Sequence, residues 1–453
     1  MKFKTMLAAA ALGISFLATQ AMATDLKYKP GEDKKFTWAN LDELKKTNLK
    51  GETLTVFGPW RGDDEKHVQV VLDYFRDATG ADVKYSSSEN YEQQVVIDTS
   101  AGSPANISVL PQPGLIADLA AKGLLSPLTA ADAKWMVDNY GAGQSWVDLG
   151  TSKGKDGAKN FYGFSYKTDV KSLVWYSPEN FKAGGYKVPE TMEDLLALSD
   201  KIVKDGGKPW CIGLGSGGAT GWPATDWIED IMLRTQKPEV YDGWVNNSVK
   251  FNDPAVINAL DIFAKFAKND AYVDGGHAGV ASIDFRDSPK GLFSTPPKCY
   301  MHHQASFIPS FFPEGTKMGK DVDFFYMPTY AAKADLGKPV LGAGTLFTIT
   351  KDSKAARAFI DFLKLPLAHE IWMADGGFLT PLKTANPAAY ASDAARKEGA
   401  MMAAATTFRF DGSDMMPGKI GAGAFWTGMV DFVGGKSSKD TADAIQKAWD
   451  GLK

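Results

Sequence analysis

Residues 100–128 read SAGSPANISVLPQPGLIADLAAKGLLSPL, and this stretch decides the fold class. Its apolar run Asn106–Leu110 predicts a buried strand, and Gly114–Lys122 predicts a helix that ends at Gly123. Two strand–helix pairs precede it, at Glu52–Phe57 with Asp64–Ala78 and at Ala81–Tyr85 with Tyr91–Ser100. Strands that alternate with helices pair in parallel, because each helix carries the chain back along the sheet. The sequence therefore predicts an α/β fold.

A second series of elements begins after residue 160 and predicts a second α/β lobe. Residues 24–50 are charged and aperiodic, so we expect an extended arm there. The later strands are expected at Phe161–Tyr166, Ser172–Tyr176, Pro209–Leu214, Lys298–His302 and Asp323–Met327. The later helices are expected at Thr191–Lys204, Pro223–Leu233, Pro254–Lys268, Lys354–Leu363, Ala424–Val433 and Thr441–Leu452.

The chain opens MKFKTMLAAAALGISFLATQAMA, which has the parts of a secretory signal peptide. Two lysines precede an apolar run, Met6–Leu17, that is too short to span a bilayer. Ala21-Met22-Ala23 is a cleavage signal, so we expect cleavage after Ala23. No cysteine follows the apolar run, so we expect no lipid anchor at that site.

The net charge, the cysteines and the histidines indicate which functions and which bonds to expect. The net charge of −4 at pH 7 argues against a general nucleic-acid-binding protein. Cys211 and Cys299 are the two cysteines, and in an oxidising compartment they predict one disulfide, with two buried thiols as the alternative. His302 and His303 are adjacent on a predicted strand and point to opposite faces, so we expect no metal site.

Residues 211–222 read CIGLGSGGATGW, and Gly213, Gly215 and Gly218 fit the dinucleotide-binding pattern G-x-G-x-x-G. That motif places its glycines at a helix start, whereas four residues separate Gly218 from Pro223, where we expect the helix to begin. The acidic partner, Glu239, lies in the turn-like stretch QKPEVYDG. A secreted chain also leaves the cytoplasmic nucleotide pool. A nucleotide-dependent oxidoreductase is therefore disfavoured, and we expect no cofactor and a flexible loop that presents Trp222.

Six segments occur in an order that resembles a known family. They are Phe57–Arg61, Ser100–Leu128, Phe161–Phe181, Gly291–Phe307, Leu341–Leu382 and Ala424–Trp449. The chain resembles the carbohydrate-binding proteins of bacterial ABC importers, of the maltose-binding-protein type. Within that family it is most similar to the subgroup that binds α-linked glucosides.

The resemblance implies a two-lobed periplasmic binding protein fold with a ligand cleft between the lobes. The expected order is a signal peptide at 1–23, lobe 1 at 24–168, lobe 2 at 169–302, lobe 1 again at 303–383 and lobe 2 again at 384–453. The expected function is capture of an α-glucoside or related oligosaccharide by lobe closure, followed by delivery to an ABC permease. We expect a monomeric periplasmic protein that is not an enzyme.

A sugar site needs aromatic rings for C–H faces and planar charged or amide groups for hydroxyls. Such side chains follow the first three predicted strands, where ligands gather in open α/β sheets. They are Trp60, Arg61 and Asp63 after the first strand, Glu89 and Tyr91 after the second, and Gln112 after the third. Helix capping and local packing are the alternative roles for these residues.

The other candidates come from later in the chain. The resemblance matches Trp222 and Trp426 to tryptophans that stack on the sugar, with burial in a core as the alternative for Trp222. The remaining candidate ligand contacts are Asp226, Trp227, Gln304, Phe307, Gly342, Gly344, Arg409 and Asp411.

Two alternatives stay open at this point. A secreted glycoside hydrolase would need two positioned carboxylates, and the many acidic residues make such a pair easy to imagine. A binding protein for a non-sugar solute would share the fold and differ in the chemistry of the cleft.

Overall fold

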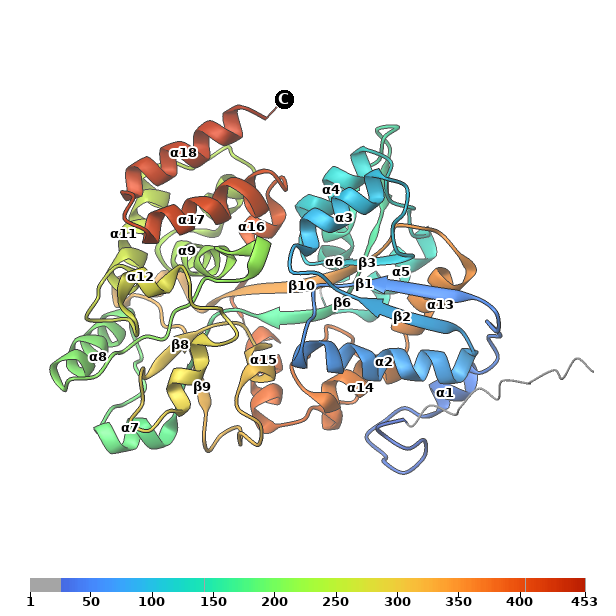
Figure 1. Cartoon of the computed structure of the whole chain (residues 1–453), viewed down its shortest axis with the longest axis horizontal. Coiled ribbons are helices and arrows are strands. Elements are labelled where there is room, and N and C mark those ends of the chain that lie inside the picture. The colour runs from blue at the N-terminus through green and yellow to red at the C-terminus, as the bar shows by residue number, and fades with distance from the viewer. Residues whose placement is uncertain (1–25, 142, 404, 453) are drawn as a thin grey trace, which may run out of the picture.

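The computed structural model describes residues 26–141, 143–403 and 405–452, which form two lobes joined by long strands (Figure 1). The largest sheet has the strand order β11–β10–β3–β1–β2, and β6 also pairs with β10. β1 pairs in parallel with β2 and β3, as the alternation of strands and helices predicts. These strands are β1 Thr53–Phe57, β2 Asp82–Ser86, β3 Ile107–Leu110, β6 Gly163–Val170, β10 Pro339–Ile349 and β11 Thr407–Phe410.

Helices cover both faces of this sheet in the first lobe (Figure 1). Val109 of β3 packs into one apolar cluster with Val71 and Phe75 of α2, and its neighbour Leu110 packs into another cluster with Ile116 of α4. Successive strand residues point to opposite faces, so each strand supplies both clusters. The helices are α1 Ala39–Leu44, α2 Asp63–Thr79, α3 Tyr91–Ser100, α4 Pro113–Ala121, α5 Ala130–Asn139, α6 Gly143–Leu149, α13 Lys354–Leu363 and α14 Pro366–Asp375.

The second lobe contains the antiparallel sheet β8–β7–β9 and a helical core. Helix α9 is buried from Pro223 to Thr235, and Trp227, Trp244 and Phe263 pack in the same apolar cluster. The strands are β7 Leu173–Tyr176, β8 Met301–His303 and β9 Asp323–Tyr326. The helices are α7 Pro178–Gly184, α8 Met192–Lys204, α9 Trp222–Thr235, α10 Pro238–Val245, α11 Pro254–Ala267, α12 Gly276–Val280, α16 Gly412–Met415, α17 Trp426–Val433 and α18 Ser438–Asp450.

Shorter elements complete the fold. β4 Thr151–Lys153 and β5 Lys159–Phe161 form a two-stranded sheet. The others are α15 Asp393–Ala403, the π-helix η6 Ile420–Phe425, and the 3-10 helices η1 Gly217–Ala219, η2 Ser288–Phe293, η3 Ile308–Phe311, η4 Ala331–Leu336 and η5 Pro387–Ala389.

Strands β6 and β10 run from one lobe to the other (Figure 1). They pair antiparallel from Gly342 opposite Val170 to Thr348 opposite Gly163, and every residue of β10 is buried. At Gly344 a β-carbon would lie 2.8 Å from the carbonyl oxygen of Lys167, so the two strands approach closely midway. This strand pair is a continuous connection between the lobes.

Three local expectations are wrong. Residues 24–50 are not an extended arm throughout, because α1 forms there and Phe36 and Leu41 are buried against the first lobe. Pro209–Leu214 is not a strand and makes only isolated bridges at Trp210. The stretch around Glu239 is the helix α10 and not a turn, since Lys237 and Pro238 begin a helix.

The disulfide prediction is confirmed. Cys211 and Cys299 are bonded, with their Cα atoms 5.4 Å apart. His302 lies next to the bond, and its Nδ1 donates to the carbonyl oxygen of Cys211 at 2.9 Å. Burial lowers the pKa of His302 to about 4, so this side chain is neutral at pH 7.

The lobe boundaries at 168, 302 and 383 stay predictions. The boundary after His302 divides β8, and it separates β8 from β9 although both strands pair with β7. The predicted signal peptide, 1–23, lies outside the described residues. Within the described residues, every helix is too short or too polar to cross a membrane.

Candidate ligand-binding cleft

A cavity lies between the two lobes and takes its walls from both. It encloses about 1050 Å³ of space, including solvent at its opening. The first lobe contributes Trp60, Glu89 and Gln112, which follow β1, β2 and β3, and the second lobe contributes Trp222 and Trp426. The predicted position at the carboxyl ends of parallel strands is therefore where this cavity begins.

Aromatic rings form much of the wall. Trp222 meets the ring of Phe285 nearly edge-on at 4.9 Å between centroids, and Phe307 lies 6.1 Å from Trp222. Trp60 is fixed from behind by Trp372 at 4.9 Å. Side chains that are packed in this way present rigid apolar faces to the cavity.

Charged side chains from the connecting strand β6 also line the cavity. Lys167 and Asp169 lie at alternate positions of β6 and therefore share one face, and Lys171 directly follows the last residue of the strand. The ammonium group of Lys167 donates to both carboxylate oxygens of Asp169, at 2.7 and 2.8 Å. These polar groups share the cavity wall with aromatic rings, an arrangement that suits an amphipathic ligand.

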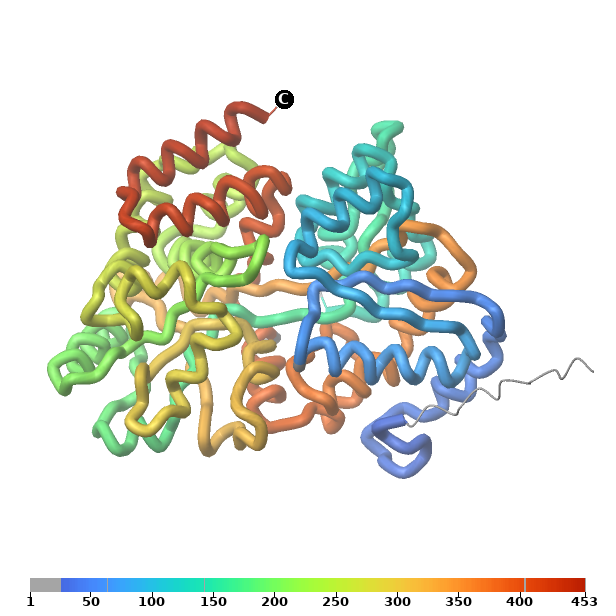
Figure 2. Tube along the Cα trace, in the orientation of Figure 1, coloured from blue at the N-terminus to red at the C-terminus, as the bar shows by residue number. Residues whose placement is uncertain are grey.

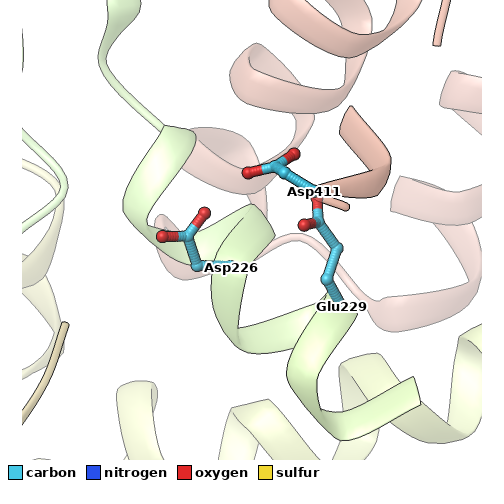
Figure 3. A group of neighbouring side chains, drawn as sticks. All are labelled: Asp226, Glu229 and Asp411. Atoms are coloured by element: carbon cyan, nitrogen blue, oxygen red, sulfur yellow. The ribbon is translucent and has the colours of Figure 1, made fainter. Parts of the chain in front are cut away.

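Three buried carboxylates, Asp226, Glu229 and Asp411, lie close together at the wall of the cavity (Figure 3), and Lys171 pairs with two of them. Its ammonium donates to Asp226 Oδ1 at 2.7 Å and also to Asp411. Asp226 and Glu229 lie one turn apart on α9, and Asp411 is the N-cap of α16, where it accepts the backbone N–H of Asp414. The group thus ties the residue that follows β6 to two helices of the second lobe.

The environment divides these carboxyl groups into two kinds. Burial raises the pKa of Asp226 and that of Glu229 well above the usual range, and the negative charge of Asp411 adds to the shift. Burial acts in the same direction on Asp411, but the Lys171 ammonium and the hydrogen bonds from Asp414 and Ser413 outweigh it and lower its pKa. Asp411 and Lys171 are therefore the charged pair of this group.

The three carboxylates are also the type of side chain that can hold a metal ion. Among the described residues, Asp226, Glu229 and Asp411 each offer an oxygen, and these oxygens lie within 4.8 Å of one another. The Lys171 ammonium already meets two of the three carboxylates. The structure therefore supplies an internal cation for this group.

Several buried polar atoms of the cavity wall have no hydrogen-bond partner among the described residues. They are Asp64 Oδ1, Gln112 Oε1, Thr345 Oγ1 and Trp426 Nε1. Leaving a buried donor or acceptor unpaired costs roughly 1–3 kcal/mol, so a ligand that pairs with it binds more favourably. The set contains acceptors and donors, which matches a ligand rich in hydroxyl groups.

Ten of the predicted residues line the cavity. They are Trp60, Arg61, Glu89, Tyr91, Gln112, Trp222, Phe307, Gly344, Asp411 and Trp426. Asp226 lies behind the wall and acts on Lys171. The side chain of Asp63 lies outside what the structure describes, and its backbone begins α2.

Four predicted residues lie elsewhere. Trp227 packs in the core of the second lobe against Trp210, with 5.1 Å between ring centroids. Arg409 forms an ion pair with Asp242 at 2.6 Å, and Gln304 accepts the N–H of Ala305 at 2.8 Å. At Gly342 a β-carbon would lie 2.3 Å from the ring of Phe408, so this glycine accommodates an aromatic ring.

The sequence reasoning missed other residues of the wall. They include Asp64, Lys167, Asp169, Lys171, Phe285, Arg286 and Thr345. A signal was present for three of them, because charged residues at every second position interrupt a buried strand in YKTDVK. Phe285 and Arg286 lie in a loop without periodicity and reach the cavity through tertiary folding.

Two sequence patterns associated with enzymes have other roles. In the run CIGLGSGGATGW, Gly221 is the N-cap of α9, and a β-carbon there would lie 2.2 Å from the carbonyl oxygen of Trp426. The glycine at this helix start therefore accommodates the close approach of the Trp426 backbone. Residues 150–154 read GTSKG and fit the nucleophile pattern G-x-S-x-G, but Ser152 lies within strand β4 and not in a strand-to-helix turn.

Two α/β lobes, two connecting strands and a cavity walled by both lobes define a bilobed solute-binding protein. The chain belongs to the family of bacterial extracellular solute-binding proteins, whose model matches residues 59–368. The resemblance read from the sequence is thus confirmed for the family, and the chain is a binding protein and not an enzyme.

Two curated relatives and one solved structure illustrate the match. The alpha-glucosides-binding periplasmic protein AglE of Rhizobium meliloti is 68% identical, over 95% of this chain and 94% of the relative. The osmoprotective compounds-binding protein GgtB of Synechocystis is 38% identical, over 87% and 92%. The bacterial solute receptor AcbH, described with an exclusive preference for β-D-galactopyranose, has a TM-score of 0.74 at 19% identity, over 88% of this chain and 97% of the receptor. The last comparison shows the fold alone.

Proposed function

We propose that this chain captures an α-glucoside in the cleft between its lobes and delivers it to an ABC permease. The observation that carries the proposal is the 68% identity, over nearly the whole of both chains, to a protein named for binding α-glucosides. The cavity supports it independently, because its wall combines tryptophan rings with charged and amide side chains.

The proposed contacts follow from the geometry of the wall. Trp222 and Trp426 of the second lobe stack on the C–H faces of the sugar, and Trp60 of the first lobe adds a third ring. Asp64, Gln112 and Thr345 bond to hydroxyl groups, since each carries a buried oxygen without a partner in the described part of the chain. A sugar that touches both lobes favours the closed arrangement of the molecule.

The cellular setting is part of the same proposal. The first 23 residues act as a signal peptide, and the mature chain works in the periplasm as a monomer. The closed, loaded form docks on the membrane subunits of an importer. The family and the name of the periplasmic relative AglE support this setting.

The alternative ligand is a non-sugar solute, because one relative is named for binding osmoprotective compounds. A thermal-shift panel separates the two, because a ligand that binds only the folded state raises the melting temperature. The panel contains maltose, sucrose, trehalose, β-linked disaccharides, and zwitterionic and polyol osmolytes. We expect a rise with at least one α-glucoside and none with β-linked disaccharides. A rise in melting temperature with the zwitterionic compounds alone would contradict the sugar and identify a non-sugar solute as the ligand.

A further inference from the structure

The glycine-rich run CIGLGSGGATGW reaches across to the other lobe. Its 3-10 helix η1 lies against the N-terminal end of α3, where a segment of the second lobe meets the first (Figure 2). The backbone N–H of Gly218 donates to the carbonyl oxygen of Glu89 at 3.2 Å. Gln93 Nε2 donates to the carbonyl oxygen of Gly218 at 3.4 Å. Segments of the two lobes that are far apart in sequence therefore touch through this run.

The approach is so close that it needs glycine. A β-carbon at Gly217 would lie 2.8 Å from the carbonyl oxygen of Glu89, and one at Gly218 would lie 2.6 Å from Asn90 Oδ1. Carbon atoms pack favourably at about 3.5–4.0 Å, so a side chain at Gly217 pushes the lobes apart. At Gly217 the obstacle is backbone and cannot rotate away, whereas at Gly218 it is a side chain.

The contact also forms part of the cavity wall. Ser88 and Glu89 line the cavity on the side of the first lobe, and Ser216 and Ala219 line it on the side of the second. The hydrogen bonds between Gly218 and α3 join these two sides. Because its halves belong to different lobes, this part of the wall exists only when the lobes are together.

We propose that the Gly217–Gly218 turn is the contact that holds the cleft closed over its ligand. Gly217 does not line the cavity, so it is a positioning residue that acts through the closed arrangement. The affinity for a ligand falls in proportion to the fraction of molecules that can adopt the closed form. A ligand too large for the two sides to meet loses this contact, so the turn also selects for ligand size. The inference rests on the proposed function only in requiring a ligand in the cleft.

Gly217→Ala tests the proposal, and Gly185→Ala is the matched control. Both glycines have a positive φ, 57° at Gly217 and 64° at Gly185, so alanine causes similar backbone strain at both. Nothing lies within 4 Å of a β-carbon at Gly185, which follows α7 in the second lobe. The control therefore reports backbone strain without obstructed closure.

We expect Gly217→Ala to bind the sugar that raises the wild-type melting temperature about tenfold more weakly, with faster release. Gly185→Ala should bind it as the wild type does. Equal affinities in the two variants would overturn the proposal. If Gly217→Ala does not fold, Gln93→Ala replaces it, since this change removes one donor to the contact without adding strain; wild-type affinity there would count as the same contradiction.

Small-angle scattering at a saturating concentration of whichever compound of the panel raises the wild-type melting temperature keeps this test separate from the proposed function. We expect a larger radius of gyration for Gly217→Ala than for Gly185→Ala, because the obstructed lobes stay further apart. Identical radii would contradict the proposal. A wild type that binds no α-glucoside would refute the proposed function and leave this comparison valid.

Discussion

Trp222 and Trp426 are the residues that test the aromatic part of the cleft. Replacing either with alanine should weaken sugar binding by about 1–3 kcal/mol, the scale of a lost aromatic contact. Trp449→Ala is the control, because Trp449 lies on α18, is partly buried and does not line the cavity. Calorimetric titration with the sugar measures the affinity of all three variants. Wild-type affinity in both cleft variants would remove the stacking roles.

Lys171 supports a prediction about stability and pH. Lys171→Met leaves Asp226 and Asp411 without their cation, and breaking a buried ion pair in this way costs about 3–5 kcal/mol. Lys290→Met, which breaks an exposed pair with Asp287, should cost under about 1 kcal/mol. Urea unfolding of the two variants at neutral pH checks the difference, and equal losses would contradict the buried role.

The sign of the pH effect follows from the raised pKa values of Asp226, Glu229 and Asp414. A carboxyl group whose pKa is higher in the folded than in the unfolded state gives stability at low pH that is lost as the pH rises through the folded value. Removing Lys171 raises these pKa values further. The loss in Lys171→Met should therefore be smaller at about pH 5 than at about pH 7.5. A loss that does not change with pH would contradict the prediction that these carboxyl groups titrate between the two pH values.

At the residue scale, the sequence predicts the side chains that directly follow parallel strands, such as Trp60, Glu89 and Gln112. It fails for Trp227 and Arg409, because local pattern does not tell a tryptophan in a buried helix or a surface ion pair from a ligand contact. It also misses Phe285 and Arg286, whose position depends on how a loop folds over the second lobe.

At the scale of elements, the disulfide joins residues 88 positions apart and constrains the second lobe. The double variant Cys211→Ser with Cys299→Ser should lose about 2–4 kcal/mol of stability, because the unfolded chain regains its freedom. Neither cysteine lines the cavity, so affinity for the sugar should stay at the wild-type value. Parallel unfolding and titration experiments separate the two effects; a large loss of affinity in the folded variant would contradict this separation.

The elements themselves were largely predictable where their patterns are long and periodic. The helix at Asp64–Ala78 and the strands around it are found nearly as expected, because their apolar residues repeat at helical or alternating spacing. Pro209–Leu214 looks like a strand and is not one, since its backbone is used in isolated bridges on both sides of Trp210. Tertiary contacts, which a local pattern does not contain, decide such segments.

At the scale of the whole molecule, the order of segments predicted two lobes, and the sheet pairings explain how they are connected. Strands β6 and β10 pair from Gly342 opposite Val170 to Thr348 opposite Gly163 and link the lobes, although they are far apart in sequence. The contact of the glycine run with α3 was not predictable, because it depends on how closely the lobes approach. The sequence of the run fits a nucleotide-binding motif, but in the structure the run contacts α3 of the other lobe.

The most direct test of the central claim is calorimetric titration of the mature protein with maltose, sucrose and trehalose, followed by chromatography of the recovered sugar. The cleft between the lobes predicts saturable binding of at least one of them at a single site, with the sugar recovered unchanged. Absence of heat with all three sugars, or the appearance of split sugar, would contradict the account.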